Sequence, residues 1–254
     1  MNLETLLSHH LLDHPYVTLF SRGNFTLAIT KHLIMMWAVA ALLAAVLVAS
    51  VHSRSSMGML LRFSVEEIIL YIRDRMVSPI FGHAADVYLP YFLTLFFFIL
   101  ACNLAGLLPG SAAVTGNISV TAALALCTFA LINFAGVREY GLVSHFAHFV
   151  PRGLPRVMAP LIFLIEIIGL CAKCLALCIR LFANIIAGHI VSISFLSLIF
   201  IFAQMSPMIG LGVAPAAVGL ALFVYALDIL VALIQAYIFT LLTAIFVGGA
   251  VHPH

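Results

Sequence analysis

The chain has 254 residues, of which 65% are hydrophobic and only 8% are charged, and its mean hydropathy is +1.23. Soluble domains carry about 25% charged residues, so this composition excludes an ordinary soluble enzyme and predicts a polytopic membrane protein. The formal net charge of +2 does not suggest a nucleic-acid partner. Residues 1–31 lack a basic stretch followed directly by an apolar core, so we do not expect a cleaved signal peptide.

Five apolar stretches predict the transmembrane helices of an all-α membrane protein. The first contains no charged residue and is long enough to cross about 30 Å of hydrocarbon. The fourth is too long for an upright span at about 1.5 Å of rise per residue, so we expect it to tilt, curve or kink. The predicted spans cover approximately residues 33–51, 88–108, 118–137, 159–204 and 215–247.

A short surface helix is expected between the first two spans. Ser64-Val-Glu-Glu67 has the spacing of a capping box, in which a serine hydroxyl and a glutamate carboxylate satisfy the first backbone N–H groups of a helix. We therefore expect this helix to begin near Ser64.

The basic residues are distributed unevenly among the loops. Because loops rich in Lys and Arg favour the cytoplasmic side, their distribution predicts an N-terminus outside and a C-terminus in the cytoplasm. Lys and Arg occur in the loops at 52–87 and 138–156 and are absent from those at 109–117 and 206–214. Residues 1–31 would then form an extracytoplasmic segment ahead of a single transmembrane domain, residues 32–254.

Three charged residues interrupt the fourth apolar stretch and fall on one helical stripe. Glu166, Lys173 and Arg180 are spaced seven residues apart, and seven residues turn a helix through about 700°. An arginine at the membrane centre costs about 2.5–3.5 kcal/mol on insertion scales, so it normally faces a partner or a water-filled path. An ion pathway is therefore the leading hypothesis. A structural salt bridge of Arg180 with Glu166 or Asp228 is the alternative.

The two long helices should form a hairpin, because Pro and Gly residues gather between Ser206 and Pro215. In an antiparallel pair, residues equally far from the turn lie at the same depth. Arg180 should therefore lie at the depth of Gln235, and His189 at the depth of Asp228. The first helix would carry Arg180 and His189 on opposite sides, because nine residues correspond to about two and a half helical turns.

Simpler interpretations stay open for several of these residues. Glu166 could neutralise Lys173, Lys173 could extend toward the membrane surface, and His189 with Asp228 could be a satisfied buried pair. We expect no metal and no cofactor. Three cysteines share one helical face, where packing of small residues explains them better than metal binding: Cys171, Cys174 and Cys178.

Several motifs together resemble one family. The segment Leu177–His189, LCIRLFANIIAGH, resembles the arginine helix of subunit a of F-type rotary ATP synthases. Leu233–Thr243 is similar to the last helix of that subunit. Asn103–Pro109 followed by Asn117 is similar to its second span and the loop after it, and Pro160–Glu166 also fits. The resemblance covers the chain from about residue 60 onward.

This resemblance implies a non-catalytic channel subunit that couples proton flow to rotation of a ring of c subunits and to ATP synthesis. Each c subunit carries a carboxylate inside the membrane. Arg180 would correspond to the essential arginine, which favours the ionised carboxylate and separates two half-channels. It cannot relay protons itself, because arginine stays protonated in proteins.

The resemblance also implies roles for the neighbouring polar residues. Asn184 and Gln235 would form hydrogen bonds around Arg180, Glu166 would belong to the inner half-channel, and the role of Lys173 is open. The outer half-channel would contain Gly188, His189 and Asp228. Many bacterial members carry the acid on the first helix and the histidine on the second, whereas this chain has them exchanged, which keeps one acid and one imidazole for a proton wire.

The implied partners are the c ring, the peripheral-stalk b subunits, other ATP synthase subunits and the lipid bilayer, in a bacterial inner membrane. No sodium-binding cage is visible, so H⁺ is favoured, with a Na⁺-translocating version as the alternative. Two other function classes have less support. A secondary transporter that binds an anion at Arg180 should show inverted repeats, and an intramembrane metalloenzyme needs a ligand cluster such as His-Glu-x-x-His; the sequence contains neither.

Overall fold

The computed structural model describes residues 15–22, 25–52, 56–108, 113–142 and 158–251. The chain forms two compact units, each built from three segments. Unit 1 comprises Met1–Val46, Phe98–Ile118 and Leu181–Gln235, and unit 2 comprises Leu47–Phe97, Ser119–Arg180 and Ala236–His254. The predictions for residues 1–14 and for most of the second basic loop concern residues outside these described ranges. The division into an N-terminal segment and one transmembrane domain stays a prediction.

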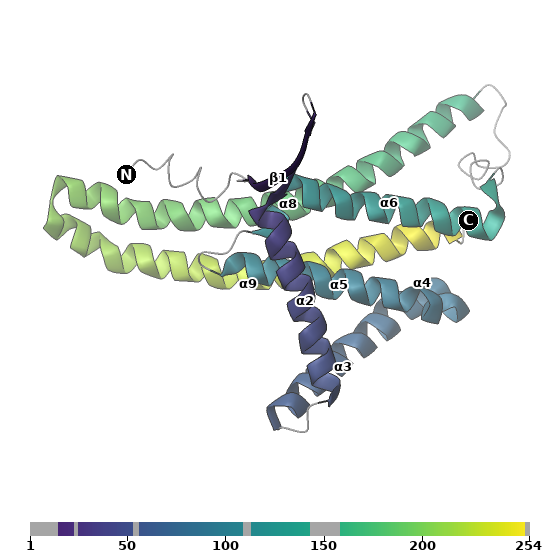
Figure 1. The fold of residues 1–254 in the computed structure, drawn as a ribbon, viewed down its shortest axis with the longest axis horizontal. Helices are drawn as coiled ribbons and strands as arrows, with labels where there is room; N and C mark the ends of the chain where they lie inside the picture. The colour runs from purple at the N-terminus through teal and green to yellow at the C-terminus, as the bar shows by residue number, and fades with distance from the viewer. Residues whose placement is uncertain (1–14, 23–24, 53–55, 109–112, 143–157, 252–254) are drawn as a thin grey trace. The chain divides into compact units, whose positions relative to one another are not determined.

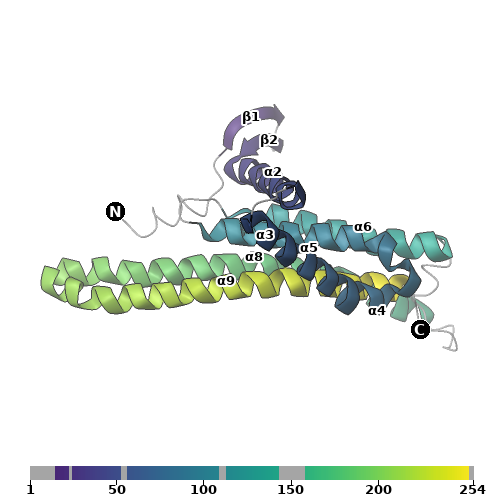
Figure 2. The ribbon, with the colours of Figure 1, turned by 90° about the horizontal axis from the view of Figure 1, so that it is seen from below.

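The all-α membrane fold is confirmed. Within the described ranges, five helical stretches are long and apolar enough to cross a membrane. The long helices are α2 (Lys31–His52), α5 (Ala85–Leu107), α6 (Ile118–Tyr140), α8 (Ala159–Met205) and α9 (Pro207–Val251). Figures 1 and 2 show α8 and α9 running side by side from their shared turn.

The turn between α8 and α9 is shorter than predicted. Only Ser206 separates the two helices, because α9 begins at Pro207 rather than near Pro215. Proline suits the first position of a helix, where its missing N–H needs no partner, and membrane helices also tolerate proline in their interior. The return is tight: a Cβ at Gly210 would lie 2.7 Å from the Cα of Ala203, so only glycine fits there.

The segment between α2 and α5 is helical over most of its length. It contains α3 (Ser56–Ile72), the π-helical turn η1 (Arg73–Val77), α4 (Ser78–Phe81) and the 3₁₀ turn η2 (Gly82–Ala84). Gly82 ends α4 with a positive φ of 53°, a conformation that favours glycine.

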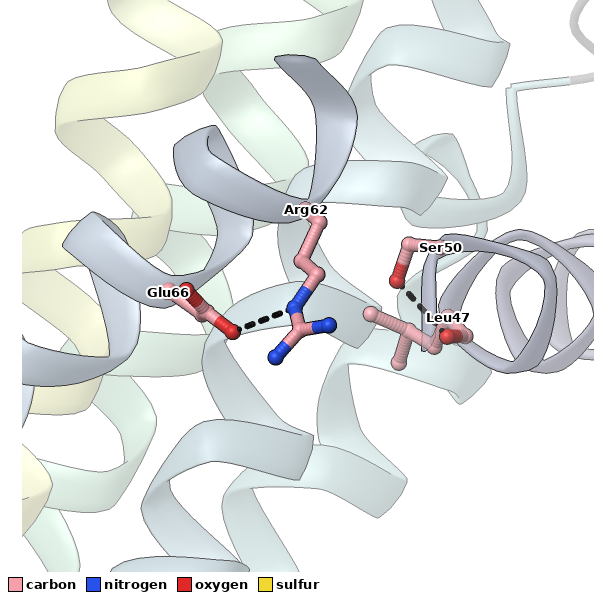
Figure 3. Close-up of polar contacts among 4 residues, drawn as sticks. All are labelled: Leu47, Ser50, Arg62 and Glu66. Atoms are coloured by element: carbon pink, nitrogen blue, oxygen red, sulfur yellow. Dashed lines mark hydrogen bonds and ion pairs between the residues drawn. The ribbon is translucent and has the colours of Figure 1, made fainter. Parts of the chain in front are cut away.

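The expectation that Ser64 begins the surface helix is wrong. α3 already starts at Ser56, and the Ser64 hydroxyl donates to the carbonyl of Leu60, 3.0 Å away and one turn earlier. A serine inside a helix commonly bonds back to its own backbone in this way instead of capping. Glu66 accepts from Arg62 Nε at 2.7 Å along the same exposed helix, as Figure 3 shows.

A two-stranded antiparallel sheet precedes α2 and was not expected. Its strands are β1 (Pro15–Arg22) and β2 (Phe25–Thr30), labelled in Figure 2. The sequence does carry a signal for it. Two runs containing β-branched and aromatic residues are separated by Gly23-Asn24, a dipeptide typical of two-residue hairpin turns. The polar residues among these runs concealed that pattern.

Candidate functional site

Arg180 and Glu166 lie in unit 2 with their side chains exposed on α8. The described residues offer neither of them a hydrogen bond or an ion pair. Within unit 2, the structure therefore gives no support to a salt bridge between Arg180 and Glu166.

The buried face of α8 explains why the charged stripe is exposed. Cys174, Leu177, Cys178 and Leu181 are all buried and follow the three- and four-residue spacing of one helical face. Cys178 Sγ lies 3.4 Å from the hydroxyl of Thr121 on α6. Cys174 and Cys178 are packing residues, as the sequence indicated, whereas Cys171 is exposed. In the parts of the chain that the structure describes, no cluster of three or more His, Cys, Asp and Glu residues could hold a metal.

Lys173, the middle residue of the stripe, differs from the other two. Its ammonium nitrogen lies 5.3 Å from the centroid of the Phe246 ring, and both residues belong to unit 2. A cation within about 6 Å of an aromatic centroid is attracted by the negative face of the ring. The ammonium is therefore directed toward α9.

A second group of predicted residues meets in unit 1. The Asp228 carboxylate of α9 lies directly over Gly188 of α8: a Cβ at Gly188 would be 2.6 Å from Oδ2 and 2.7 Å from Oδ1. His189 is the next residue along α8. The predicted match in depth between Asp228 and this part of α8 is thus confirmed. His189 Nε2 is buried and finds no hydrogen-bond partner among the described residues.

Gln235 lies on the same side of α9 as Asp228, since seven residues separate them. It is only 5% exposed, and its Nε2 donor has no partner in the described part of the chain. Asn184 on α8 is half-buried. Hydrogen bonding of Gln235 and Asn184 around Arg180 stays a prediction.

A buried amide, Asn103 of α5, completes the polar groups of unit 1. Its Oδ1 accepts from Thr115 Oγ1 at 2.9 Å, and its Nδ2 donates to the carbonyl of Ala232 at 3.5 Å. Thr115 belongs to the 3₁₀ turn η3 (Val114–Gly116), and both side chains are fully buried. Ala232 lies between Asp228 and Gln235 on one stripe of α9. The sequence analysis named Asn103 only as part of the segment Asn103–Pro109. The signal for its structural role was an amide side chain inside an apolar run.

Comparison with known proteins decides the family. The family model described as "ATP synthase A chain" matches residues 33–248, most of the chain. The chain belongs to this family. The match begins well before residue 60, where the resemblance noted in the sequence started.

Named relatives agree with this assignment to subunit a. ATP synthase subunit a of Chloroherpeton thalassium is 42% identical over 236 residues, covering 90% of this chain and 68% of the relative. Subunit a of Anaeromyxobacter dehalogenans is 40% identical over 235 residues, covering 91% and 60%. That of Anaeromyxobacter sp. Fw109-5 is 39% identical over 236 residues, covering 91% and 56%. The chain thus spans only 56% to 68% of the length of these curated relatives.

Membership in the subunit a family confirms two predictions. The chain is a multi-pass membrane protein of an ion-transporting complex, and it is a non-catalytic subunit rather than an enzyme in itself. Other ATP synthase subunits follow as partners.

Proposed function

We propose that this subunit a guides protons to and from a rotating ring of c subunits, so that proton flow drives ring rotation and ATP synthesis. The observation that supports this most directly is Arg180. It carries a permanent charge at an exposed position of a long apolar helix, and the described residues supply no counter-ion. A carboxylate on a passing c subunit would be that counter-ion.

The arginine would act by charge alone. Its field favours the ionised form of the ring carboxylate, so a proton leaves as each c subunit approaches. Because the guanidinium does not lose its own proton, it also blocks direct flow between the two sides of the membrane. Gln235 and Asn184 would orient the guanidinium through their amide groups.

The outer half-channel would be built around Gly188, His189 and Asp228. An imidazole gains and loses a proton near neutral pH, and the unpartnered Nε2 of His189 supplies a buried site for a proton or a water. The Asp228 carboxylate would accept a proton from it or pass one to it. The missing side chain at Gly188 leaves room for the Asp228 carboxylate to lie against α8. Asn103 would hold α9 between its two functional side chains, Asp228 and Gln235.

The inner half-channel would include Glu166, which is exposed near the start of α8. In this arrangement, the start of α8 would lie at the cytoplasmic side of a bacterial inner membrane, with the N-terminus of the chain outside and the C-terminus inside. The c ring would dock along the Arg180 side of α8, and the peripheral-stalk b subunits would hold the subunit against rotation.

The decisive experiment replaces Arg180 with alanine in the assembled complex. ATP-driven proton pumping into inverted membrane vesicles should be lost, while ATP hydrolysis by the soluble head continues. The matched control is Ile179→Ala, because Ile179 is a neighbouring exposed residue without charge. Unchanged pumping by Arg180→Ala would reject the proposal.

The same vesicles distinguish H⁺ from Na⁺ as the transported ion. The acid–imidazole pair favours protons, so pumping should not require added sodium. Acidification that depends on Na⁺, or ²²Na⁺ uptake that persists when a protonophore collapses the proton gradient, would instead support the sodium-translocating alternative.

A further inference from the structure

Lys173 is held on the charged stripe of α8 by an aromatic ring of the other long helix. Of Glu166, Lys173 and Arg180, only Lys173 has a described partner, the ring of Phe246 at 5.3 Å from its ammonium nitrogen. Phe246 is half-buried, so the surrounding side chains of unit 2 restrict its ring. A lysine ammonium on a flexible stem would otherwise extend to the membrane surface.

This contact holds the positive charge of Lys173 near the positive charge of Arg180. Lys173 precedes Arg180 by seven residues, which is about 10 Å along a helix. A protonated lysine has three donors and no acceptor, so it cannot pick up a further proton. What it can supply is a field, and a field at this range acts on any carboxylate that passes the stripe.

We infer that Phe246 is a positioning residue, which holds Lys173 as a second fixed cation on the inner proton route. This inference rests on the proposed function, because the ring carboxylate is the group on which the cation acts. The cation favours the ionised carboxylate on the inner side of Arg180. Uptake of a proton from the cytoplasm therefore requires a lower pH than it would without Lys173.

Other titratable groups lie near enough to be considered. Glu166 and Arg180 lie one heptad away on either side, and Glu166 offsets part of the Lys173 field. The inner part of α9, Ala236–Val251, contributes only Tyr237. Tyr71 of α3 lies near Tyr237, with ring centroids 6.1 Å apart, and Ile80 of α4 lies over Gly248, so the groups that flank α4 count as well: Arg73, Asp74, Arg75 and His83. The others are the thiols of Cys171, Cys174 and Cys178 on α8 and, at the end of α6, Arg138, Glu139 and Tyr140. None of these groups is altered in the Lys173 and Phe246 variants below.

The test measures ATP-driven proton pumping in inverted vesicles, whose cytoplasmic face is in contact with the medium, as the pH of the medium is raised. Lys173→Met should move the alkaline limit of pumping upward by up to about one pH unit, because the ring carboxylate then takes up protons more easily. Phe246→Leu should move it in the same direction by a smaller amount. Phe246→Tyr keeps an aromatic face and should leave the limit unchanged.

The double variant Lys173→Met/Phe246→Leu separates positioning from packing. If Phe246 acts through Lys173, the double variant should match Lys173→Met alone. A further shift on adding Phe246→Leu, or no shift in Lys173→Met, would overturn the inference. If Phe246→Leu prevents assembly, Phe246→Met takes its place in both the single and the double variant. Lys173→Arg keeps the charge and serves as the control for Lys173→Met. Arg180→Ala tests the proposed function separately, so a failure of this inference can be told apart from a failure of that function.

Discussion

Gly188 shows how one missing side chain shapes the outer half of the hairpin. A methyl group there would lie 2.6 to 2.8 Å from three atoms of the Asp228 carboxylate, so that group would have to turn away. We expect Gly188→Ala to lower the pumping rate several-fold while the complex still assembles. Gly169→Ala on the same helix is the control, because a Cβ there meets nothing within 4 Å. Equal rates for the two variants would contradict a positional role for Gly188.

Thr115 provides a test of the buried amide. Thr115→Val keeps the shape of the side chain but leaves Asn103 Oδ1 buried without its 2.9 Å hydrogen bond. Such a loss costs about 1–3 kcal/mol. The melting temperature of the purified subunit should therefore fall, whereas Thr115→Ser, which retains the hydroxyl, should change it little. A Thr115→Val variant as stable as the native chain would show that the bond is dispensable.

At the scale of elements, two threonines on one face of α6 should respond in opposite ways to the same change. Thr121 and Thr128 are both fully buried, one heptad apart. Thr121 contacts Cys178, whereas the Thr128 hydroxyl faces the Tyr91 hydroxyl without a hydrogen bond of good geometry. Replacing an unsatisfied buried hydroxyl with a methyl group removes a desolvation cost. Thermal unfolding should show Thr128→Val to be neutral or stabilising and Thr121→Val to be destabilising by about 1 kcal/mol. The reverse order would be inconsistent with this packing.

Local sequence patterns predicted which segments are helical better than they predicted the residues at which the helices begin and end. The long apolar runs gave α2, α5 and α6 because length and hydropathy alone decide whether a helix can span a membrane. Proline and serine were misleading as signals for the start of a helix. Pro215 and Ser64 were each expected near a helix start, but Pro215 lies inside α9 and Ser64 inside α3, because a helix can continue through either residue.

At the scale of the whole molecule, depth along the hairpin could be predicted but side-chain partners could not. Equal distance from the turn was enough to bring Asp228 to the depth of Gly188. The pairing of Lys173 with Phe246 depends on how α8 and α9 are rotated about their axes. A single sequence carries no direct record of that rotation. The same limit applies to Asn103, whose partners come from a turn and from a third helix.

The one-residue connection at Ser206 limits which insertions and deletions the hairpin can tolerate during evolution. Surface loops usually accommodate insertions and deletions, but here a single residue connects α8 to α9. Adding one residue on either side of Ser206 would advance the following arm by about 1.5 Å and swing it through about 100°. Asp228 would then leave Gly188, although every original amino acid would still be present. The number of residues between these two positions is thus itself constrained.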